Sequence, residues 1–372
     1  MKNSLYIAKI SGIKIFIHWS FFLLIAWIVI SSIRDGNDFL QTILSVAFIL
    51  TIFCCVVLHE LGHALTAKKF NYITKDIILL PIGGMARINE LPENPKQEFL
   101  IAVAGPIVNI VIALILFPFI NWAQINPASL EKFVISGSNF IFSLFAVNLS
   151  LAVFNLIPAF PMDGGRVFRA VLSIWMNRVS ATAVAARTGQ FISFIFLIFG
   201  ILYNPVLALI GVFIFITAKA ENDEVKSKYF LHNYTVNDAM SHHYYKLDKT
   251  ATIKEAAKLL IDVDPSDFLI VDNEKIVGTL SSDEIIKALV EKGEGVKVEE
   301  AMNSKVKFIT KDIALDEVMK VLTDGKEKIM PVMDNNNVIG TVDMNNILKL
   351  IMVSSASQKH SASKVEEEIL QS

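Results

Sequence analysis

Cysteine is nearly absent from this chain, and charged residues are scarce. The two cysteines, Cys54 and Cys55, are adjacent inside an apolar run. An adjacent pair cannot build a disulfide framework, so the sequence indicates no oxidising compartment. We expect both to be packing residues; metal binding is the alternative, although the pair lacks zinc-ligand spacing relative to His59. Charged residues make up 19% of the chain, below the roughly 25% that is usual in soluble domains.

An excess of charge of either sign is also missing. The formal net charge is −2 and the sequence has no basic tract, which argues against a nucleic-acid partner. No small-residue cleavage site follows the first apolar stretch. We therefore expect the N-terminus to lead into a retained membrane span and not to be a signal peptide.

Hydrophobic residues, in contrast, are abundant and unevenly distributed. They make up 53% of the 372 residues, and the first 220 residues are packed with Phe, Ile, Leu and Val, whereas the remainder is rich in Lys, Glu and Asp. This shift in composition predicts a membrane domain over residues 1–220, a charged linker over 221–235 and a soluble domain over 236–352. The last segment, 353–372, has no core pattern, and we expect it to be disordered.

Six apolar segments are candidates for membrane spans. We expect them at about residues 15–33, 40–66, 98–120, 133–157, 188–203 and 206–219. Asn204-Pro205 interrupts the last long apolar run and separates the final two. Lys and Arg gather in the N-terminal arm and after the second, fourth and sixth segments, and such residues mark the cytoplasmic side. The sequence therefore predicts a polytopic α-helical membrane protein in the cytoplasmic membrane of a prokaryote, with both termini in the cytoplasm.

An H-E-x-x-H string, made by His59, Glu60 and His63, lies at the end of the second expected span. On a helix, positions i and i+4 share one face, with Cβ atoms about 5–6 Å apart. Two imidazoles at that spacing can bind one Zn²⁺, and the adjacent glutamate can activate a bound water. An exposed polar helix end is the alternative. Ionisable residues flanked by apolar ones in a membrane segment should face protein or water and mark function, which favours zinc.

A catalytic zinc needs a third protein ligand and an open position. The remaining histidines are poor candidates, because His18 falls in the first expected span and the others fall in the soluble half or the tail. Asp163, between Pro161 and two glycines, is the better candidate, and an Asp-Gly turn is the alternative. The second and fourth spans both run inward, so the two motifs should reach the same depth on the cytoplasmic side.

Three ordered stretches resemble the site-2 protease family of intramembrane zinc proteases. They are LHELGHA at 58–64, AGPIVN at 104–109 and NLIPAFPMDGGR at 155–166. The resemblance implies that one Zn²⁺ is bound by His59, His63 and Asp163, and that Glu60 is the catalytic acid and base. Zinc would then lower the pKa of a water and polarise the scissile carbonyl, while the glutamate would move the proton to the leaving amine.

The same resemblance points to further polar residues. It implies that Asn155 helps to hold the substrate or its oxyanion; helix-end hydrogen bonding is the alternative. Asn109 and His18 occupy positions similar to recurrent polar residues of the family. We count Asn109 among the substrate-contact candidates, and support of a metal ligand or a hydrogen bond between helices would explain either residue equally.

A short β-hairpin or re-entrant loop is expected just after the zinc helix. Residues 73–90 show short apolar runs around Gly83-Gly84. An exposed strand edge there could pair with an unwound substrate stretch by β-addition, and the resemblance implies the same arrangement. We therefore predict that residues 82–88, including Ile82, Gly83, Gly84 and Met85, bind substrate. A loop that only packs on the helices is the alternative.

The soluble half contains an internal repeat. VNDAMS at 236 is echoed by VEEAMN at 298, and the stretch 267–289 is echoed by 328–350. Each copy, of about 60 residues, reads helix, strand, turn, strand, helix, and the turns after Asp272 and Asp334 suit hairpins. The pattern resembles a tandem pair of CBS motifs, a soluble α+β module that often binds adenine nucleotides and regulates an attached protein.

The CBS resemblance departs from its family at the nucleotide-binding positions. Family copies that bind nucleotide carry Ser or Thr three residues after the turn glycine and Asp three further on. Here Gly278 is followed by Ser281 and Glu284, and the second copy has Asp343 and Asn346. The ribose-binding aspartate is missing from both copies, which leaves Ser281 and Thr279 as weak candidates. A structural or dimerising role is therefore as well supported as nucleotide sensing.

The sequence as a whole predicts an intramembrane zinc endoprotease. By resemblance alone, its substrate would be a membrane-tethered regulator, such as an anti-sigma or pro-sigma factor. One alternative is a transporter or channel gated by the CBS pair, with the His/Glu cluster as an ion site, but charged residues deep in several spans are missing. A catalytically idle scaffold is the other alternative, and the intact residues His59, Glu60, His63 and Asp163 argue against it.

Overall fold

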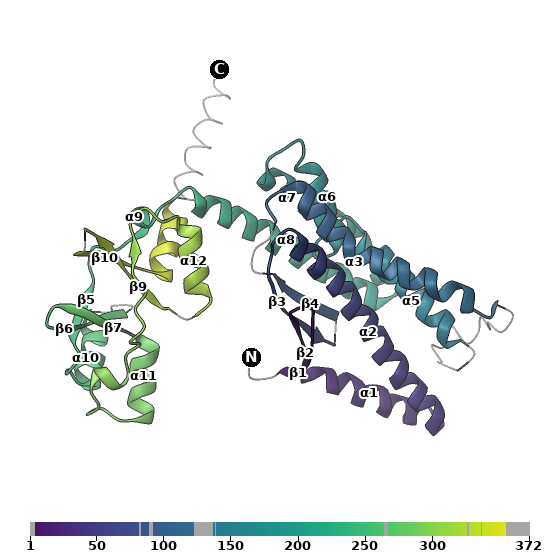
Figure 1. Ribbon diagram of the computed structural model, residues 1–372, viewed down its shortest axis with the longest axis horizontal. Coiled ribbons are helices and arrows are strands. Elements are labelled where there is room, and N and C mark those ends of the chain that lie inside the picture. The colour runs from purple at the N-terminus through teal and green to yellow at the C-terminus, as the bar shows by residue number, and fades with distance from the viewer. Residues whose placement is uncertain are drawn as a thin grey trace, which may run out of the picture. The chain divides into compact units, whose positions relative to one another are not determined.

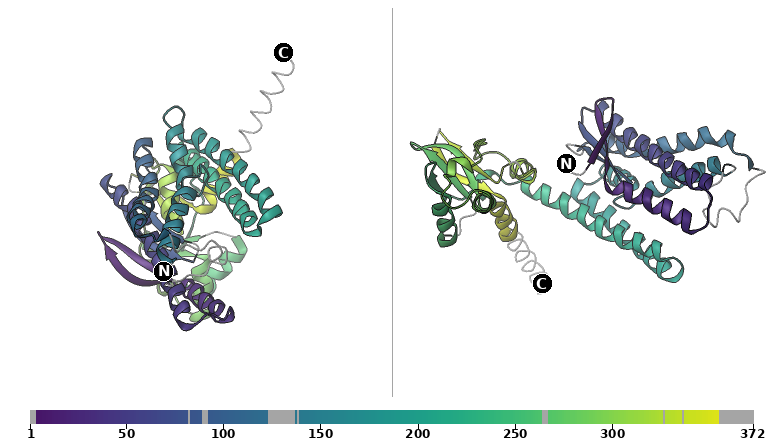
Figure 2. Two further views of the ribbon diagram at one scale, coloured as in Figure 1. Left: turned by 90° about the vertical axis from the view of Figure 1, so that its right-hand side faces the viewer. Right: turned by 90° about the horizontal axis from the view of Figure 1, so that it is seen from below.

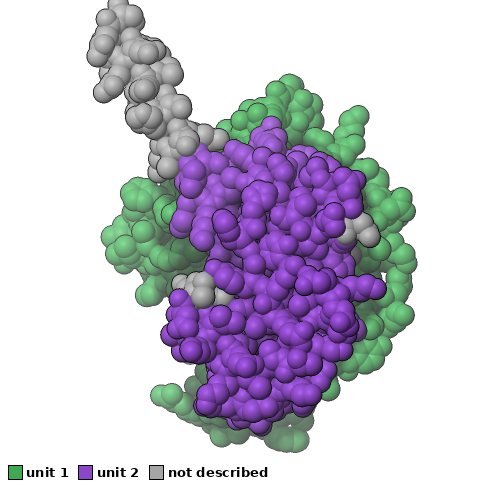
Figure 3. Space-filling view, turned by 90° about the vertical axis from the view of Figure 1, so that its left-hand side faces the viewer, with its two compact units in different colours: residues 1–225 green, residues 226–372 purple. Residues whose placement is uncertain are grey.

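The structure is a computed structural model that describes residues 4–81, 83–88, 92–122, 137, 139–263, 267–325, 327–335 and 337–354. It divides into two compact units, residues 1–225 and 226–372, drawn in different colours in Figure 3. Each unit has its own buried apolar clusters. The predicted tail beyond residue 354 lies outside the described residues.

Unit 1 is mainly helical (Figure 1). Its helices are α1 (Ser20–Arg34), α2 (Phe39–Lys69), α3 (Pro95–Leu116), α5 (Phe140–Asn155), α6 (Asp163–Leu172), α7 (Arg178–Tyr203) and the first part of α8 (Pro205–His232), whose last residues belong to unit 2. α3 packs against α2, α5 and α6, so it lies at the centre of the unit. The predicted linker begins inside α8, whose helical residues continue to His232.

Local sequence explains where several of these helices begin and end. Asp38 caps α2 in a capping box, since its carboxylate accepts from the Gln41 backbone N–H at 2.7 Å. The predicted break at Asn204-Pro205 is confirmed: α7 ends at Tyr203, and Pro205 begins α8, where its missing N–H costs nothing. The two helices fold back on each other at this point (Figure 2).

The prediction of six spans is not confirmed. Within the described residues, four helices are long and apolar enough to cross a membrane, namely α2, α7, α8 and the segment Pro95–Phe119 that contains α3. The first expected span, 15–33, is wrong in its first part, because residues Ile13–His18 form a strand and α1 has only 15 residues. Such a helix is about 22 Å long, shorter than the roughly 30 Å hydrocarbon core. α5 has 16 residues, and residues 123–136 before it lie outside the described ranges.

A four-stranded sheet lies beside α2 in unit 1 (Figure 1). Its strands, in spatial order, are β1 (Ser4–Ile10), β2 (Ile13–His18), β3 (Thr74–Leu80) and β4 (Gly83–Ile88). The hairpin expected after the zinc helix is present, since β3 and β4 pair in antiparallel fashion. β2 pairs with β3 in parallel, and the buried side chains of Ile13, Ile15 and Ile77 cover the helix face. β4 ends the sheet on the side of α2 that carries the H-E-x-x-H string.

Unit 2 contains two similar three-stranded sheets, one for each sequence repeat. The first copy comprises β5 (Tyr245–Asp248), α10 (Ile253–Val263), β6 (Asp267–Asp272), β7 (Lys275–Ser281) and α11 (Ser282–Glu291). The second comprises β8 (Ile309–Thr310), α12 (Leu315–Thr323), β9 (Ile329–Asp334), β10 (Asn337–Asp343) and a helix over 344–354. The predicted hairpin turns are confirmed, because β6 pairs with β7 and β9 with β10 in antiparallel fashion.

Candidate metal centre

α2 presents both histidines of the H-E-x-x-H string on one face, one turn apart. Their Nε2 atoms lie 3.1 Å from each other, and the side chains of His59 and His63 are buried, with 7% and 8% of their surfaces exposed. Two buried imidazoles in van der Waals contact need an explanation, because neither ring nitrogen can be left without a partner at no cost.

The hydrogen bonds of the two Nδ1 atoms fix the tautomers of the imidazoles. His63 Nδ1 lies 2.7 Å from the carbonyl oxygen of Ile101, which can only accept, so this nitrogen carries the proton. His59 Nδ1 is hydrogen-bonded to Oδ1 of Asn109 on α3, so it is the donor as well. Both Nε2 atoms therefore present lone pairs towards each other, which is the tautomer that a metal ligand needs.

A buried asparagine pair sets the orientation of the Asn109 amide. Asn148 Nδ2 donates to the Leu144 carbonyl at 2.9 Å, so Asn148 Oδ1 must be the atom that accepts from Asn109 Nδ2, also at 2.9 Å. Asn109 Oδ1 then faces His59. Both asparagines are fully buried. Sequence reasoning did not find Asn148, although an amide inside an apolar helix was a signal, since such groups need partners within the protein.

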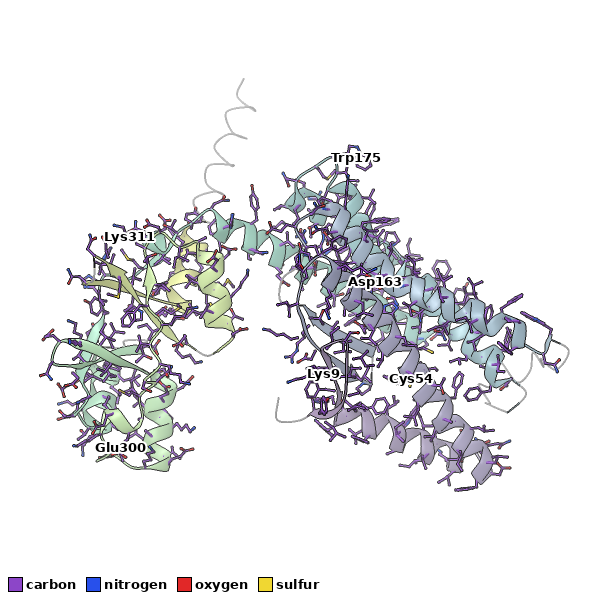
Figure 4. The ribbon with its side chains drawn as sticks, viewed as in Figure 1. Lys9, Cys54, Asp163, Trp175, Glu300 and Lys311 are labelled. Atoms are coloured by element: carbon purple, nitrogen blue, oxygen red, sulfur yellow. The ribbon has the colours of Figure 1, made fainter. Side chains whose placement is uncertain are left out.

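Asp163 is the third residue at this point. It is the first residue of α6, inside unit 1 (Figure 4), and its Oδ2 lies 3.2 Å from Nε2 of both His59 and His63. The three ligand atoms form a group that could hold a metal ion. Oδ2 is buried and has no partner with hydrogen-bonding geometry, which agrees with neutral imidazoles whose Nε2 atoms carry no proton.

The spacing of these atoms fits zinc. Donor atoms bound to a tetrahedral zinc at 2.0–2.1 Å are about 3.3 Å apart, close to the 3.1–3.2 Å observed. Three lone pairs that converge without a proton repel one another, so a cation is the natural partner. Two imidazoles and one carboxylate are also a ligand set that catalytic zinc uses. The predicted trio His59, His63 and Asp163 is thus brought together by the fold.

Gly105 on α3 provides the space in which the imidazoles lie. A Cβ atom at Gly105 would be 2.2 Å from His63 Nε2 and 2.7 Å from His59 Cε1, distances that no side chain tolerates. The glycine of the AGPIVN stretch therefore lets α3 approach the ligands closely. With Ile101 and Asn109, it makes one face of α3 the wall of the site.

Glu60 lies beside the trio and faces the sheet. A Cβ atom at Gly84 of β4 would be 2.7 Å from Glu60 Cγ and 3.3 Å from Cδ. The glutamate side chain is therefore packed against the backbone of the edge strand, in a place that only glycine leaves open. This contact brings a carboxylate, a strand edge and the three ligand atoms into one region of unit 1.

The other residues that the sequence singled out lie in several different helices and strands. Asn155 is the half-buried last residue of α5. Ile82 lies outside the described residues, and Gly83 begins β4. His18 is the last residue of β2, so the prediction that it falls within a helical span is wrong. Its Nδ1 lies 2.7 Å from Ser20 Oγ. Cys55 is buried, with its Sγ 3.6 Å from Asn148 Nδ2, as expected of a packing residue, whereas Cys54 is exposed and does not fit that expectation.

In unit 2, the positions that departed from the nucleotide-binding pattern are occupied by helix caps. Ser281 Oγ donates to Glu284 Oε2 at 2.9 Å, and the Glu284 backbone N–H donates back to Ser281. Asp343 and Asn346 make the corresponding reciprocal contacts in the second copy. Thr279 and Ser281 are each only 4% exposed. The Ser281 hydroxyl, one of the two weak candidates for ligand binding, thus already has a partner within the chain.

Two imidazoles, a carboxylate and a nearby glutamate among apolar helices define the class of zinc metallopeptidases. The model of peptidase family M50 matches residues 47–199, and that of the CBS domain matches 236–291 and 298–353. A zinc metalloprotease of Methanocaldococcus jannaschii is 31% identical over 354 residues, which cover 95% of this chain and 97% of that protein. Stage IV sporulation protein FB of Bacillus subtilis is 31% identical over 126 residues, 34% of this chain and 40% of that protein. A solved site-2 protease from M. jannaschii is 37% identical and covers 59% of this chain and 95% of that one, with a TM-score of 0.44.

The chain belongs to peptidase family M50 and carries a tandem CBS pair. It is a zinc metalloprotease with apolar helices that make it an integral membrane protein. The predicted resemblance to site-2 proteases is confirmed, and the transporter alternative is set aside.

Proposed function

We propose that this protein hydrolyses a peptide bond in or beside a membrane-spanning segment of another membrane protein. The observation that carries the proposal is the convergence of His59, His63 and Asp163, whose ligand atoms lie 3.1–3.2 Å apart inside apolar helices. In this proposal the three residues bind one Zn²⁺. The family assignment supports both the metal and the peptidase chemistry.

The residues around the trio have distinct roles in the proposed reaction. Zinc, when bound, lowers the pKa of a water and polarises a peptide carbonyl. Glu60 accepts the proton of the attacking water and delivers it to the leaving amine. Asn109 holds His59 in the tautomer that leaves Nε2 free to bind metal, a role that was the alternative to its predicted contact with substrate. Asn155 stabilises the developing oxyanion through its amide.

The edge strand β4 is the proposed binding site for the substrate. A peptide bond within a helix is shielded, so the substrate must unwind locally before it is cut. Among the described residues β4 is the last strand of the sheet, and an unwound stretch can pair with its outer edge by β-addition. Because Glu60 packs on Gly84, a substrate strand on this edge would lie beside the proton-transfer group.

Further aspects of the proposal rest on the sequence. The substrate is a membrane-tethered regulator, such as an anti-sigma or pro-sigma factor, and both termini face the cytoplasm of a prokaryotic cell. The domain limits are those given above: 1–220 for the protease, 221–235 for the linker and 236–352 for the CBS pair. The CBS pair regulates the protease or joins two copies; an adenine nucleotide would have to displace the cap contacts of Ser281 and Glu284.

The decisive experiment compares zinc content and proteolysis for the wild type and Glu60→Gln. The amide keeps the size of the side chain but cannot accept the water proton, so the variant should keep about one zinc per chain and lose at least 100-fold in cleavage rate. Fragments of membrane proteins in cells that carry each form would identify the substrate. Glu291→Gln, an exposed change in unit 2, is the matched control and should behave as the wild type. A wild type without zinc, or a Glu60→Gln variant that still cleaves, would contradict the proposal.

A further inference from the structure

A buried ion cluster includes residues of α3 and α6, the helices that also contribute to the candidate metal centre. It joins Arg169 of α6, Glu98 of α3, Arg178 of α7 and Glu221 of α8. The Arg169 side chain is fully buried and Glu98 is 3% exposed. Each of these four groups has a partner of opposite charge within the cluster. The proposed proton-transfer chemistry uses none of them.

Arg169 is the centre of this cluster. Its Nε donates to Glu98 Oε1 at 2.8 Å, and Nη2 donates to the same oxygen. Nη1 donates to Glu221 Oε1 at 2.6 Å. The guanidinium carbon also lies 5.0 Å above the ring centre of Phe160, in the segment that leads into α6. The planar fork of arginine thus meets three different segments in fixed directions.

The helix that carries Arg169 also carries Asp163 at its first residue. α6 has only 10 residues, too few to hold its position by its own helical stability, so external contacts must fix it. Glu98 lies in the first turn of α3, the helix whose Ile101 carbonyl and Asn109 amide orient the two imidazoles. The Arg169–Glu98 pair therefore ties the element that bears the carboxylate to the element that orients the histidines.

We infer that Arg169, Glu98 and Glu221 are positioning residues for the metal centre: the two ion pairs of Arg169 hold α6 against α3 and α8, so that Asp163 lies within bonding reach of a zinc bound by His59 and His63. This inference rests on the metal role proposed above for those three residues. Glu221 is the member best suited to a test, because its side chain is 21% exposed and its loss leaves the Arg169–Glu98 pair in place.

The test measures the zinc dissociation constant of the full-length protein in detergent by competition with a chelator. Glu221→Gln should raise this constant by about 10- to 100-fold, the range seen when groups that orient ligands are lost. Cleavage should fall at limiting zinc and recover at saturating zinc, with KM for the substrate unchanged. Arg169→Lys, which keeps the charge but not the fork, should have the same effect. Glu224→Gln, exposed on the same helix, is the matched control and should bind zinc as the wild type.

A purely structural role predicts a different pattern. In that case Glu221→Gln would lower the melting temperature of the metal-free protein and leave the zinc constant unchanged, which would overturn the inference alone. A wild type that binds no zinc would overturn the proposed function and this inference together. If Arg169→Lys does not fold, the Glu221→Gln measurement still decides.

Discussion

At the residue scale, the metal centre depends on two glycines, Gly105 and Gly84, whose lack of a side chain leaves room for the neighbouring functional groups. His59 and His63 fit only because the nearest residue of α3 has no side chain, and Glu60 fits against β4 for the same reason. Neither Gly105 nor Gly84 has a side chain that could take part in peptide hydrolysis. Interiors are close-packed, so a single methyl group at such a position must displace something, and here the displaced groups are the functional ones.

Gly105→Ala should therefore abolish zinc binding without touching a ligand. Its Cβ would lie 2.2 Å from His63 Nε2, so the imidazole has to move by about 1 Å or more, well outside the tolerance of a metal site. We expect at least a 100-fold loss of zinc affinity, measured by chelator competition. Gly295→Ala, where a Cβ meets nothing within 4 Å, should leave the affinity unchanged. Wild-type zinc affinity in Gly105→Ala would show that the imidazoles do not occupy this space.

At the element scale, sequence patterns predicted the features that are formed by residues close together in the chain. The H-E-x-x-H string, the Asp-Gly segment that carries Asp163 and the Asn204-Pro205 break each lie within a few residues, so local sequence identified them. The strand over Ile13–His18 was mistaken for part of a span, because a continuous apolar run does not distinguish strand from helix. Its partner, β3, is about 60 residues away along the chain. Asn148 and the Arg169 cluster were missed for the same reason, since their partners come from other helices.

The edge strand β4 offers a test of substrate binding. Proline removes a backbone N–H and clashes with neighbouring strands, so Met85→Pro should break either the ladder with β3 or the pairing with substrate. Cleavage should fall by at least 100-fold while zinc content stays at the wild-type level, because the ligands come from α2 and α6. Ile82→Pro should act in the same way. Met85→Ala, which retains the N–H, is the control and should cleave normally; normal cleavage by Met85→Pro would rule out β4 as the docking strand.

At the scale of the whole molecule, we expect the stability of unit 1 to depend on zinc and the stability of unit 2 to depend on pH. Zinc bound at the proposed site should stabilise unit 1, because a ligand that binds only the native state adds to the stability of that state. Unit 2 instead contains a carboxyl group, Asp267, whose pKa is raised to about 7 by burial and by the nearby charges of Asp343 and Glu284. The folded form of unit 2 therefore holds a proton that the unfolded chain releases near pH 4.

The sign of the resulting pH dependence is fixed by this raised pKa. Stability from the bound proton is fully present below the ordinary pKa of aspartate and is lost as pH rises through 7. Between pH 5.5 and 8, the free energy of unfolding of unit 2 should fall by on the order of 1–2 kcal/mol, and its thermal transition should shift down by several degrees. Asp267→Asn should remove most of this shift, whereas Asp262→Asn, exposed on α10, should retain it.

A chelator at constant pH should lower only the transition of unit 1. Differential scanning calorimetry of the full-length protein in detergent measures both, and a pH shift that survives in Asp267→Asn would assign the proton to another group.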